Sequence, residues 1–261
     1  MQKFWITLTC VAAAALSLSA TPQAQNPKPV SSTWKTPWSY EGARGPSHWG
    51  DLDPDYSACK DGKAQSPIDI RATEKSHLPA LTFEYKSGPL NIINNGYTAV
   101  RVDYVHSGNF LIVGDNRFEL TQFHFHRPSE ELIHGKQFDM VLHLMHKAAD
   151  GKIAGVAIML KSGAANPTIE KLWKYVPQAA GDVQQIPDVE INPADLLPSS
   201  TGYYTYAGSQ TAPPCTEGVT WFILKTPIEI SKSQIATFAK LYPHDVRPAQ
   251  PLNGRTVKES R

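Results

Sequence analysis

Turn signals recur about every ten residues along the middle of the chain, and they restrict it to short secondary-structure elements. They lie at Ser87-Gly88-Pro89, Asn94-Asn95-Gly96, Ser107-Gly108-Asn109, Gly114-Asp115-Asn116 and Ala149-Asp150-Gly151. Residues that favour β-strands fill the runs 98–105, 109–113, 118–126, 138–146, 153–160 and 219–224. This rhythm predicts a mainly β protein built on a mostly antiparallel sheet.

Only two segments have a helical pattern. Residues 166–176 begin Asn-Pro-Thr and then place Ile169, Leu172 and Trp173 at helical spacing. Residues 231–241 begin with Ser231, a residue type that caps helices. No internal repeat or linker interrupts the chain after Trp38, so we expect one large β-dominated domain over 38–261 with a few short helices at its periphery.

Composition narrows the functional classes. The chain has 261 residues, of which 41% are hydrophobic, and its 25 basic and 24 acidic residues give a formal charge of +1. Proteins bind nucleic acids and anionic membrane surfaces through clustered Lys and Arg residues, and no basic cluster occurs in this sequence. We therefore expect neither as a partner.

The N-terminal segment has the pattern of a secretory signal peptide. Lys3 precedes an apolar stretch from Phe4 to Ala20, which is too short to span a bilayer comfortably. We predict a signal peptide over 1–24, cut after Ala20 or Ala24, and a flexible leader over 25–37. The expected location is periplasmic or secreted, with no membrane association once the signal is removed.

Cysteine use is in keeping with export. Cys10 would leave with the signal, so Cys59 and Cys215 remain. In an oxidising compartment such a pair usually forms a disulfide, here closing a loop of more than 150 residues. Two unrelated buried thiols are the alternative.

A cluster of histidines predicts a metal site. In the alternating segment from Leu120 to His126, Gln122, His124 and His126 would share one face of a strand. A second strand would add His143 on the face that also carries Val141 and Met145. Three neutral imidazoles can hold Zn²⁺ and leave a fourth position for water, which is typical of catalytic zinc. Core and surface histidines without a metal are the alternative, and Gln122 is a candidate to orient a ligand.

These residues resemble the zinc site of the α-class carbonic anhydrases. The resemblance covers most of the chain after Trp38, with order and spacing preserved. Its motifs are Gly45-Pro-Ser-His-Trp49, Gln65-Ser-Pro-Ile-Asp69, Asn94-Asn-Gly96, Gln122-Phe-His-Phe-His126, Pro128-Ser-Glu-Glu131, Leu142-His-Leu-Met-His146, Thr211-Ala-Pro-Pro-Cys-Thr-Glu-Gly-Val-Thr-Trp221 and Arg247-Pro-Ala-Gln-Pro251. The resemblance implies a single domain around a large, mainly antiparallel twisted sheet, and the Cys59–Cys215 pair looks like the disulfide of exported bacterial members.

The resemblance also implies an activity. One zinc per chain, held by His124, His126 and His143, would carry the hydroxide that attacks CO₂ to give bicarbonate and a proton. Thr211 would accept the hydrogen bond of that hydroxide and donate its own to Glu130, and Gln122 would orient His124. Cleavage of activated esters is implied as a possible secondary activity.

The implied CO₂ pocket departs from the family pattern. It would be lined by Met145, Gly155, Gln210, Val219 and Trp221. The family usually has Val at the positions of Met145 and Gly155 and often Leu at that of Gln210. A larger, a smaller and a polar side chain could compensate one another in volume.

Three further departures concern proton transfer and ligand orientation. Tyr97 stands where well-studied members have the histidine that shuttles protons, and a phenol with a pKa near 10 relays them less well than an imidazole near 6.5. Val141 replaces a glutamate that commonly orients the third ligand, a role that a carbonyl or water could take over. Asp245 replaces a usual asparagine.

Two other functions compete with this interpretation. One is a binding domain that kept the fold, although such relatives typically lose a zinc histidine. The other is a zinc hydrolase acting on esters or phosphates, for which the chain offers no leaving-group apparatus. Monomer and homodimer both remain open.

Overall fold

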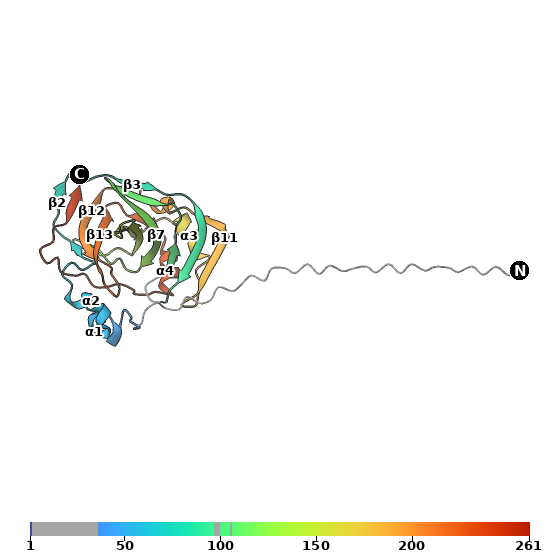
Figure 1. Cartoon of the computed structure of the whole chain (residues 1–261), viewed down its shortest axis with the longest axis horizontal. Helices are drawn as coiled ribbons and strands as arrows, with labels where there is room; N and C mark the ends of the chain where they lie inside the picture. The colour runs from blue at the N-terminus through green and yellow to red at the C-terminus, as the bar shows by residue number, and fades with distance from the viewer. Residues whose placement is uncertain (2–35, 97–99, 105) are drawn as a thin grey trace.

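The computed structural model describes residues 36–96, 100–104 and 106–261, together with Met1 (Figure 1). The predicted signal peptide, the leader up to residue 35 and Tyr97 lie outside the described residues.

Within these residues the chain forms fifteen β-strands, where the sequence predicts six strand runs, of which 98–105 lies partly outside the described residues. They are β1 Asp69–Ile70, β2 Glu74–Ser76, β3 Leu81–Glu84, β4 Gly88–Asn94, β5 Val100–Asp103, β6 Phe110–Val113, β7 Asn116–His126, β8 Leu132–Ile133, β9 Met140–Ala148, β10 Ile153–Ser162, β11 Val183–Ile191, β12 Tyr203–Ser209, β13 Glu217–Leu224, β14 Ile228–Ile230 and β15 Lys258–Ser260. All but β1 and β8 belong to one large sheet.

The main path of this sheet runs β11-β4-β5-β7-β9-β10-β13-β12-β15-β2, with β7, β9 and β10 near its middle. Most neighbours are antiparallel, while β10 pairs in parallel with β13 and β14, and β15 with β2. The predicted mainly β, mostly antiparallel fold is confirmed, and the parallel pairs make the sheet a mixed one.

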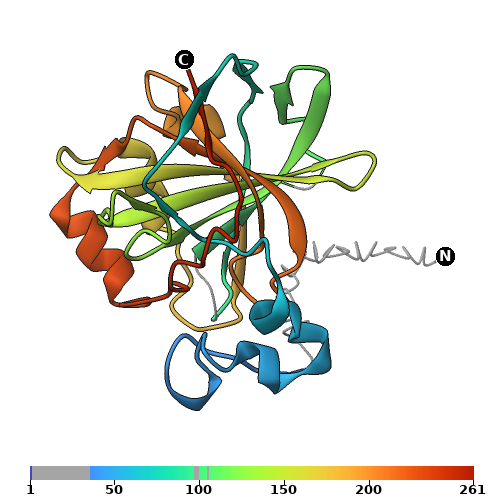
Figure 2. The same ribbon diagram turned by 90° about the vertical axis from the view of Figure 1, so that its left-hand side faces the viewer.

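The helices are short and lie around the sheet (Figures 1 and 2). They are α1 Trp49–Leu52, α2 Ala58–Asp61, α3 Pro167–Trp173 and α4 Lys232–Ala239, with 3-10 turns η1 Gly42–Arg44, η2 Pro54–Tyr56 and η3 Pro193–Leu196. Both predicted helices begin at their predicted caps. The Asn166 side chain accepts from the N–H groups of Thr168 and Ile169, and Ser231 forms a reciprocal capping box with Gln234.

The core side of β7 is fixed by its phenylalanines. Phe123 and Phe125 are fully buried, and the Phe125 ring packs edge-on against Trp173 of α3 with ring centroids 5.0 Å apart. Because side chains alternate along a strand, this packing turns the histidines of the same segment to the opposite face.

The sequence pattern implied that the alternation begins at Leu120, but in the structure it does not extend back that far. The register between β7 and β9 shifts between Leu120 and Gln122, which marks a β-bulge at Thr121. Leu120 therefore joins the same core cluster as Phe123. The Thr121 hydroxyl donates to the carbonyl of Met145, 2.9 Å away, which holds the bulge against β9.

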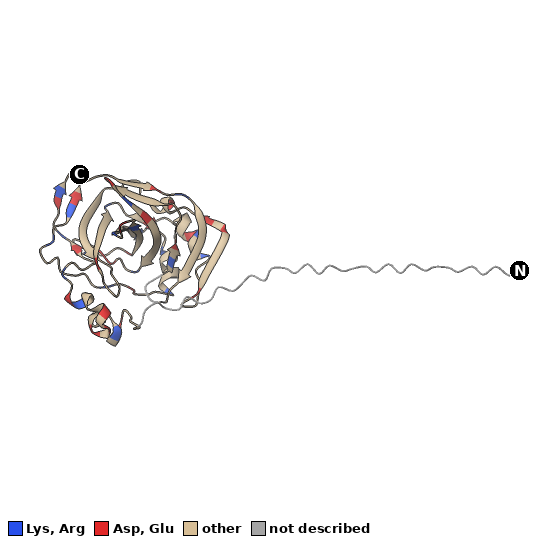
Figure 3. Ribbon diagram, viewed as in Figure 1, with Lys and Arg blue, Asp and Glu red and all other residues tan. Residues whose placement is uncertain are grey.

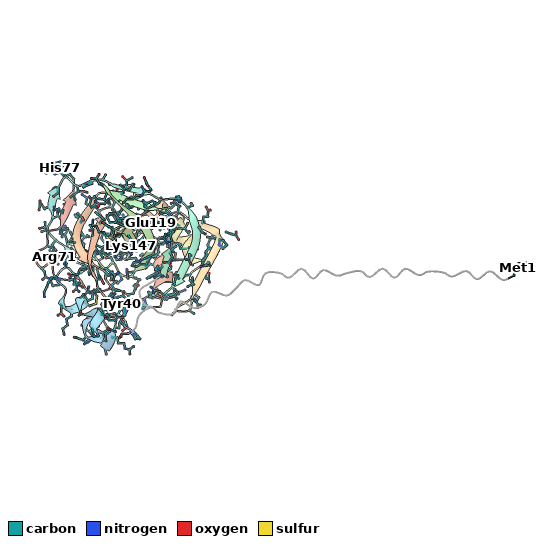
Figure 4. The ribbon with its side chains drawn as sticks, viewed as in Figure 1. Met1, Tyr40, Arg71, His77, Glu119 and Lys147 are labelled. Carbon is teal, nitrogen blue, oxygen red and sulfur yellow. A yellow bond between two sulfur atoms is a disulfide. The ribbon has the colours of Figure 1, made fainter. Side chains whose placement is uncertain are left out.

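A disulfide ties the N-terminal helices to the sheet. Cys59 in α2 is bonded to Cys215, so the predicted pairing is confirmed. Around it Trp38, Trp49 and Tyr56 form a separate buried cluster. Figure 2 shows α1 and α2 in blue at one end of the molecule, where Tyr40, labelled in Figure 4, packs on Trp49.

Most charged residues lie at the periphery, and the buried exceptions among the described residues are Glu130, Glu131, Asp245 and Arg247. Figure 3 shows Lys, Arg, Asp and Glu on α1 and α2, on the edge strand β2 and on its neighbour β15, while most of the inner strands carry other residues. On the inner strands, the half-buried Glu119 of β7 lies opposite the exposed Lys147 of β9, and both are labelled in Figure 4. In the part of the chain that the structure describes, no helix is long and apolar enough to cross a membrane.

Candidate metal centre

Three histidines converge where β7 and β9 pair. His124 and His126 lie two residues apart on β7, and His143 lies directly opposite His124 on β9. One nitrogen of each ring lies within 4.8 Å of the others, which is the spacing that ligands of a common ion need. His126 and His143 are buried, whereas His124 is half-buried.

Two of the three rings have a defined tautomer because their outer nitrogens face carbonyl oxygens, which can only accept. Nδ1 of His124 donates to Oε1 of Gln122 at 2.8 Å, as the sequence predicts. Nδ1 of His126 donates to the backbone carbonyl of Asp245, also at 2.8 Å. Both rings therefore direct the Nε2 lone pair toward the shared point.

The third ring faces a carboxylate. Nε2 of His143 lies 3.4 Å from Oε2 of Glu131, so Nδ1 is the nitrogen left for the shared point. Both side chains are completely buried. Val141, which replaces the glutamate expected from the resemblance, packs in an apolar cluster with Ile68 and Ile70.

The unpartnered atoms at this point fit a zinc ion. Nε2 of His126 and Nδ1 of His143 are buried and have no hydrogen-bond partner among the described residues. Leaving such groups unpaired in the interior costs free energy, which a coordinated cation would offset. Burial, together with the neighbouring His126 and His143, holds the pKa of His124 well below its usual value, so this ring is the neutral form that binds metals.

Asp245 supports the centre through its backbone. The carbonyl oxygen orients His126, and the carboxylate accepts from the N–H of Arg127 at 2.8 Å. Burial raises the pKa of this carboxyl above its usual range. Because any residue supplies a carbonyl, the exchange of asparagine for aspartate leaves the contact to His126 intact.

Glu130 and Thr211 lie beside the histidines. Glu130 is fully buried, and its Oε1 accepts from the backbone N–H of Arg247 at 2.9 Å. Its Oε2 has no partner within the described residues and lies 3.7 Å from Nε2 of His126. That oxygen is available as the acceptor predicted for the buried Thr211, and the hydrogen bond between them stays a prediction.

The sequence profile of the eukaryotic-type carbonic anhydrase family matches residues 44–261. The chain belongs to this family. It is 44% identical over 224 residues to a carbonic anhydrase of Klebsiella pneumoniae, covering 85% of this chain and 90% of that protein. It is 42% identical over 228 residues to a carbonic anhydrase of Nostoc sp., covering 85% and 86% of the two proteins.

A solved relative shares the whole architecture. The α-carbonic anhydrase of Thermovibrio ammonificans, in complex with the inhibitor sulfanilamide, superposes with a TM-score of 0.83 at 39% identity. The match covers 86% of this chain and all of the other. This protein is therefore an enzyme of the carbonic anhydrase family, zinc-dependent through His124, His126 and His143.

Four of the five residues predicted to line the carbonic anhydrase pocket lie together, and Trp221 among them lies beside His143. Met145, Val219 and Trp221 belong to one apolar cluster, and the Trp221 ring lies 4.8 Å from that of His143. Gly155 pairs with Met145 on one side and with Trp221 on the other. Gln210 is half-buried and its N–H donates to the carbonyl of Thr216.

Packing against Trp221 explains why position 155 of this enzyme is a glycine. A Cβ atom at this position would lie 2.6 Å from Cζ3 of Trp221, closer than non-bonded carbons approach. The indole therefore takes the space that a valine would fill at position 155. Met145 lies opposite Gly155 on the neighbouring strand. Whether these residues receive CO₂ stays a prediction.

Two residues of the carbonic anhydrase centre were not singled out from the sequence. Glu131 lies in the matched Pro128–Glu131 motif, but its approach to His143 depends on the path of the loop before β8. Arg247 opens another matched motif. Its guanidinium donates to Gln65 Oε1 and to the carbonyls of Ser66 and Cys59, each at 2.8 Å.

Proposed function

We propose that this carbonic anhydrase catalyses the reversible hydration of CO₂ to bicarbonate and a proton. The observation that carries the proposal is the pair of buried, unpartnered nitrogens on His126 and His143, converging with His124 in a chain of this family. Three neutral imidazoles from paired strands leave a coordination position open, as catalytic zinc requires.

Zinc, when bound, lowers the pKa of a coordinated water toward neutrality so that it can attack CO₂, an effect for which carbonic anhydrases are the standard example. The three histidines hold the site rigid because Gln122, the Asp245 carbonyl and the β7–β9 pairing fix their rings. Rigid, buried ligands place the reacting oxygen at one point near the apolar cluster that contains Trp221.

Thr211 and Glu130 would orient the attacking oxygen. Glu130 is anchored by the Arg247 N–H through one oxygen, and the other is free to accept from the Thr211 hydroxyl. With its proton committed to Glu130, the hydroxyl can only accept from the reacting oxygen, which then presents a lone pair to CO₂. This is a positioning role for both residues.

CO₂ has no dipole, so an apolar wall suits it better than hydrogen-bonding groups do. Met145, Val219 and Trp221 supply such a wall beside His143. The same site offers a secondary esterase activity, because the attack that converts CO₂ also fits an activated ester.

We further propose export to the periplasm or the medium. The Cys59–Cys215 disulfide supports an oxidising compartment, since such bonds persist there and are rare in the cytosol. Bacterial carbonic anhydrases from Klebsiella and Nostoc are among the similar proteins. The predicted signal peptide, residues 1–24, stays a prediction.

The test is stopped-flow CO₂ hydration by the zinc-loaded, oxidised protein and by Thr211→Val. We expect activity in the wild type and a loss of about 100-fold in kcat/KM for the variant, the scale of effect that misplacing a reacting group produces. The matched control is Thr220→Val, the same substitution at an exposed position of β13.

Absence of CO₂ hydration in the zinc-loaded wild type would overturn the proposal. Hydrolysis of p-nitrophenyl acetate, measured on the same samples, separates the rival hydrolase. An ester rate that survives while CO₂ hydration is absent would favour that rival.

A further inference from the structure

Glu131 is a buried carboxylate without a structural counter-charge. It is completely inaccessible to solvent, and among the described residues the only basic side chain within ion-pair distance is His143. Its Oε1 has no hydrogen-bond partner in the same part of the chain. Burying a carboxylate in this way is costly unless a positive charge lies nearby.

The backbone around Glu131 is held firmly in place. The Ser129 hydroxyl donates to the Glu131 carbonyl at 2.8 Å, and the next residue, Leu132, donates its N–H to the carbonyl of Ile68 at 3.2 Å. Ser129 also accepts from the N–H of Phe138. These hydrogen bonds fix the loop between β7 and β8, and the loop in turn fixes the position of Glu131.

At this position the Glu131 carboxylate lies next to the outer nitrogen of His143, the third metal ligand. Oε2 of Glu131 lies 3.4 Å from Nε2 of His143, on the side of the ring away from the shared metal point. Val141 lies on the same strand face as His143, two residues earlier, and is sealed into the apolar cluster with Ile68 and Ile70. No carboxylate reaches His143 from β9 itself.

We propose that Glu131 orients His143 and retains the zinc ion, so that a loop residue performs the task that a glutamate on the strand performs elsewhere in the family. A carboxylate that accepts from Nε2–H holds the proton there, leaves Nδ1 as the ligating nitrogen and raises its basicity. The two positive charges of zinc are then balanced by Glu130 and Glu131, which explains why a fully buried Glu131 is tolerated.

The test measures zinc retention and does not depend on CO₂ hydration, so it can fail independently of the proposed function. Glu131→Gln keeps the shape and an acceptor oxygen but removes the charge, and Glu131→Ala removes both. The control is Glu229→Gln, which alters an exposed carboxylate on β14 that accepts from the N–H of Ala164.

We expect the zinc dissociation rate constant, measured with a chelator in excess, to rise about 10–100-fold in Glu131→Gln and further in Glu131→Ala. The control should release zinc at the wild-type rate. The urea midpoint of the metal-free Glu131→Gln protein should be no lower than that of the metal-free wild type, because without zinc the buried charge has no counter-charge to lose.

Either of two results would overturn the inference. One is zinc release from Glu131→Gln within threefold of the wild-type rate. The other is a fall in the urea midpoint of the metal-free variant as large as that of the zinc-loaded one, which would make Glu131 a structural residue only.

Discussion

The outer nitrogens of the three histidine ligands meet three chemically different acceptors: an amide oxygen from Gln122, a backbone carbonyl from Asp245 and a carboxylate from Glu131. Only the first could be predicted, because Gln122 and His124 share a strand face two residues apart. The other two acceptors come from loops that are distant in sequence or fold back on the strand. No periodicity predicts where those loops pass.

Tyr97 is the residue on which the rate of this enzyme is expected to depend. Each turnover releases a proton, and a phenol with a pKa near 10 relays it poorly at neutral pH. We predict that imidazole buffer raises kcat at saturating CO₂ severalfold in the wild type. In Tyr97→His the stimulation should be smaller and kcat in the absence of imidazole higher.

An unchanged kcat on addition of imidazole to the wild type would show that another route carries the proton. A non-titrating co-solute at the same concentration serves as the control for ionic and viscosity effects.

His146 lies on the core side of β9, and its titration makes the free energy of unfolding depend on pH. Burial lowers its pKa to about 3, and as the neutral form it accepts from the Tyr85 hydroxyl at 2.6 Å. The unfolded chain takes up a proton here below about pH 6.5, whereas the folded protein does not until about pH 3. The contribution of His146 is therefore complete above pH 6.5 and is lost on acidification toward pH 3.

We predict that His146→Gln flattens the pH dependence of the free energy of unfolding between pH 6.5 and 4.5 by about 1.4 kcal/mol per pH unit at most. Urea unfolding at several pH values measures this slope, with the exposed His106→Asn as the control. Parallel curves for wild type and His146→Gln would contradict the assignment.

Among the elements, those with a strong local pattern were predicted and those defined by their partners were not. Strands β7, β9 and β10 and helices α3 and α4 lie within or close to the predicted ranges. Strands of two or three residues, such as β1, β8 and β14, exist only because another strand runs beside them. The bulge at Thr121 likewise depends on the register with β9.

Gly155 on β10 links strand packing to the pocket wall. We predict that Gly155→Ala lowers the free energy of unfolding by about 1–3 kcal/mol, because its Cβ would meet the Trp221 ring at 2.6 Å. The cost should shrink when Trp221→Leu is introduced as well, which a double-mutant cycle of urea unfolding measures.

Gly88→Ala on β4 is the matched control, since the nearest atom to its Cβ would lie at an ordinary 3.7 Å. Equal costs of Gly155→Ala with and without the indole would refute the contact as the cause.

The molecule as a whole is held together by one covalent link between distant segments. Cys59 and Cys215 are 156 residues apart in sequence, and the bond joins the α1–α2 region to the loop that follows Thr211. The α1–α2 region is also linked to the site through Arg247, whose guanidinium donates to the Cys59 carbonyl while its backbone N–H donates to Glu130. The N-terminal helices therefore belong to the structural support of the site.

We predict that the double variant Cys59→Ser/Cys215→Ser loses about 2–5 kcal/mol in its free energy of unfolding. Wild-type protein reduced with dithiothreitol should behave like the variant, and a loss below about 1 kcal/mol would show that the non-covalent contacts suffice.

We propose that one zinc ion on His124, His126 and His143 makes this chain a CO₂ hydratase. The most direct test adds zinc stepwise to the metal-free, oxidised protein and records the initial rate of CO₂ hydration at each step. We predict a rate that rises linearly and stops rising at one zinc per chain, and no such rise in His143→Ala. A protein that binds one zinc per chain without gaining activity, or a His143→Ala variant that gains the full rate, would contradict the account.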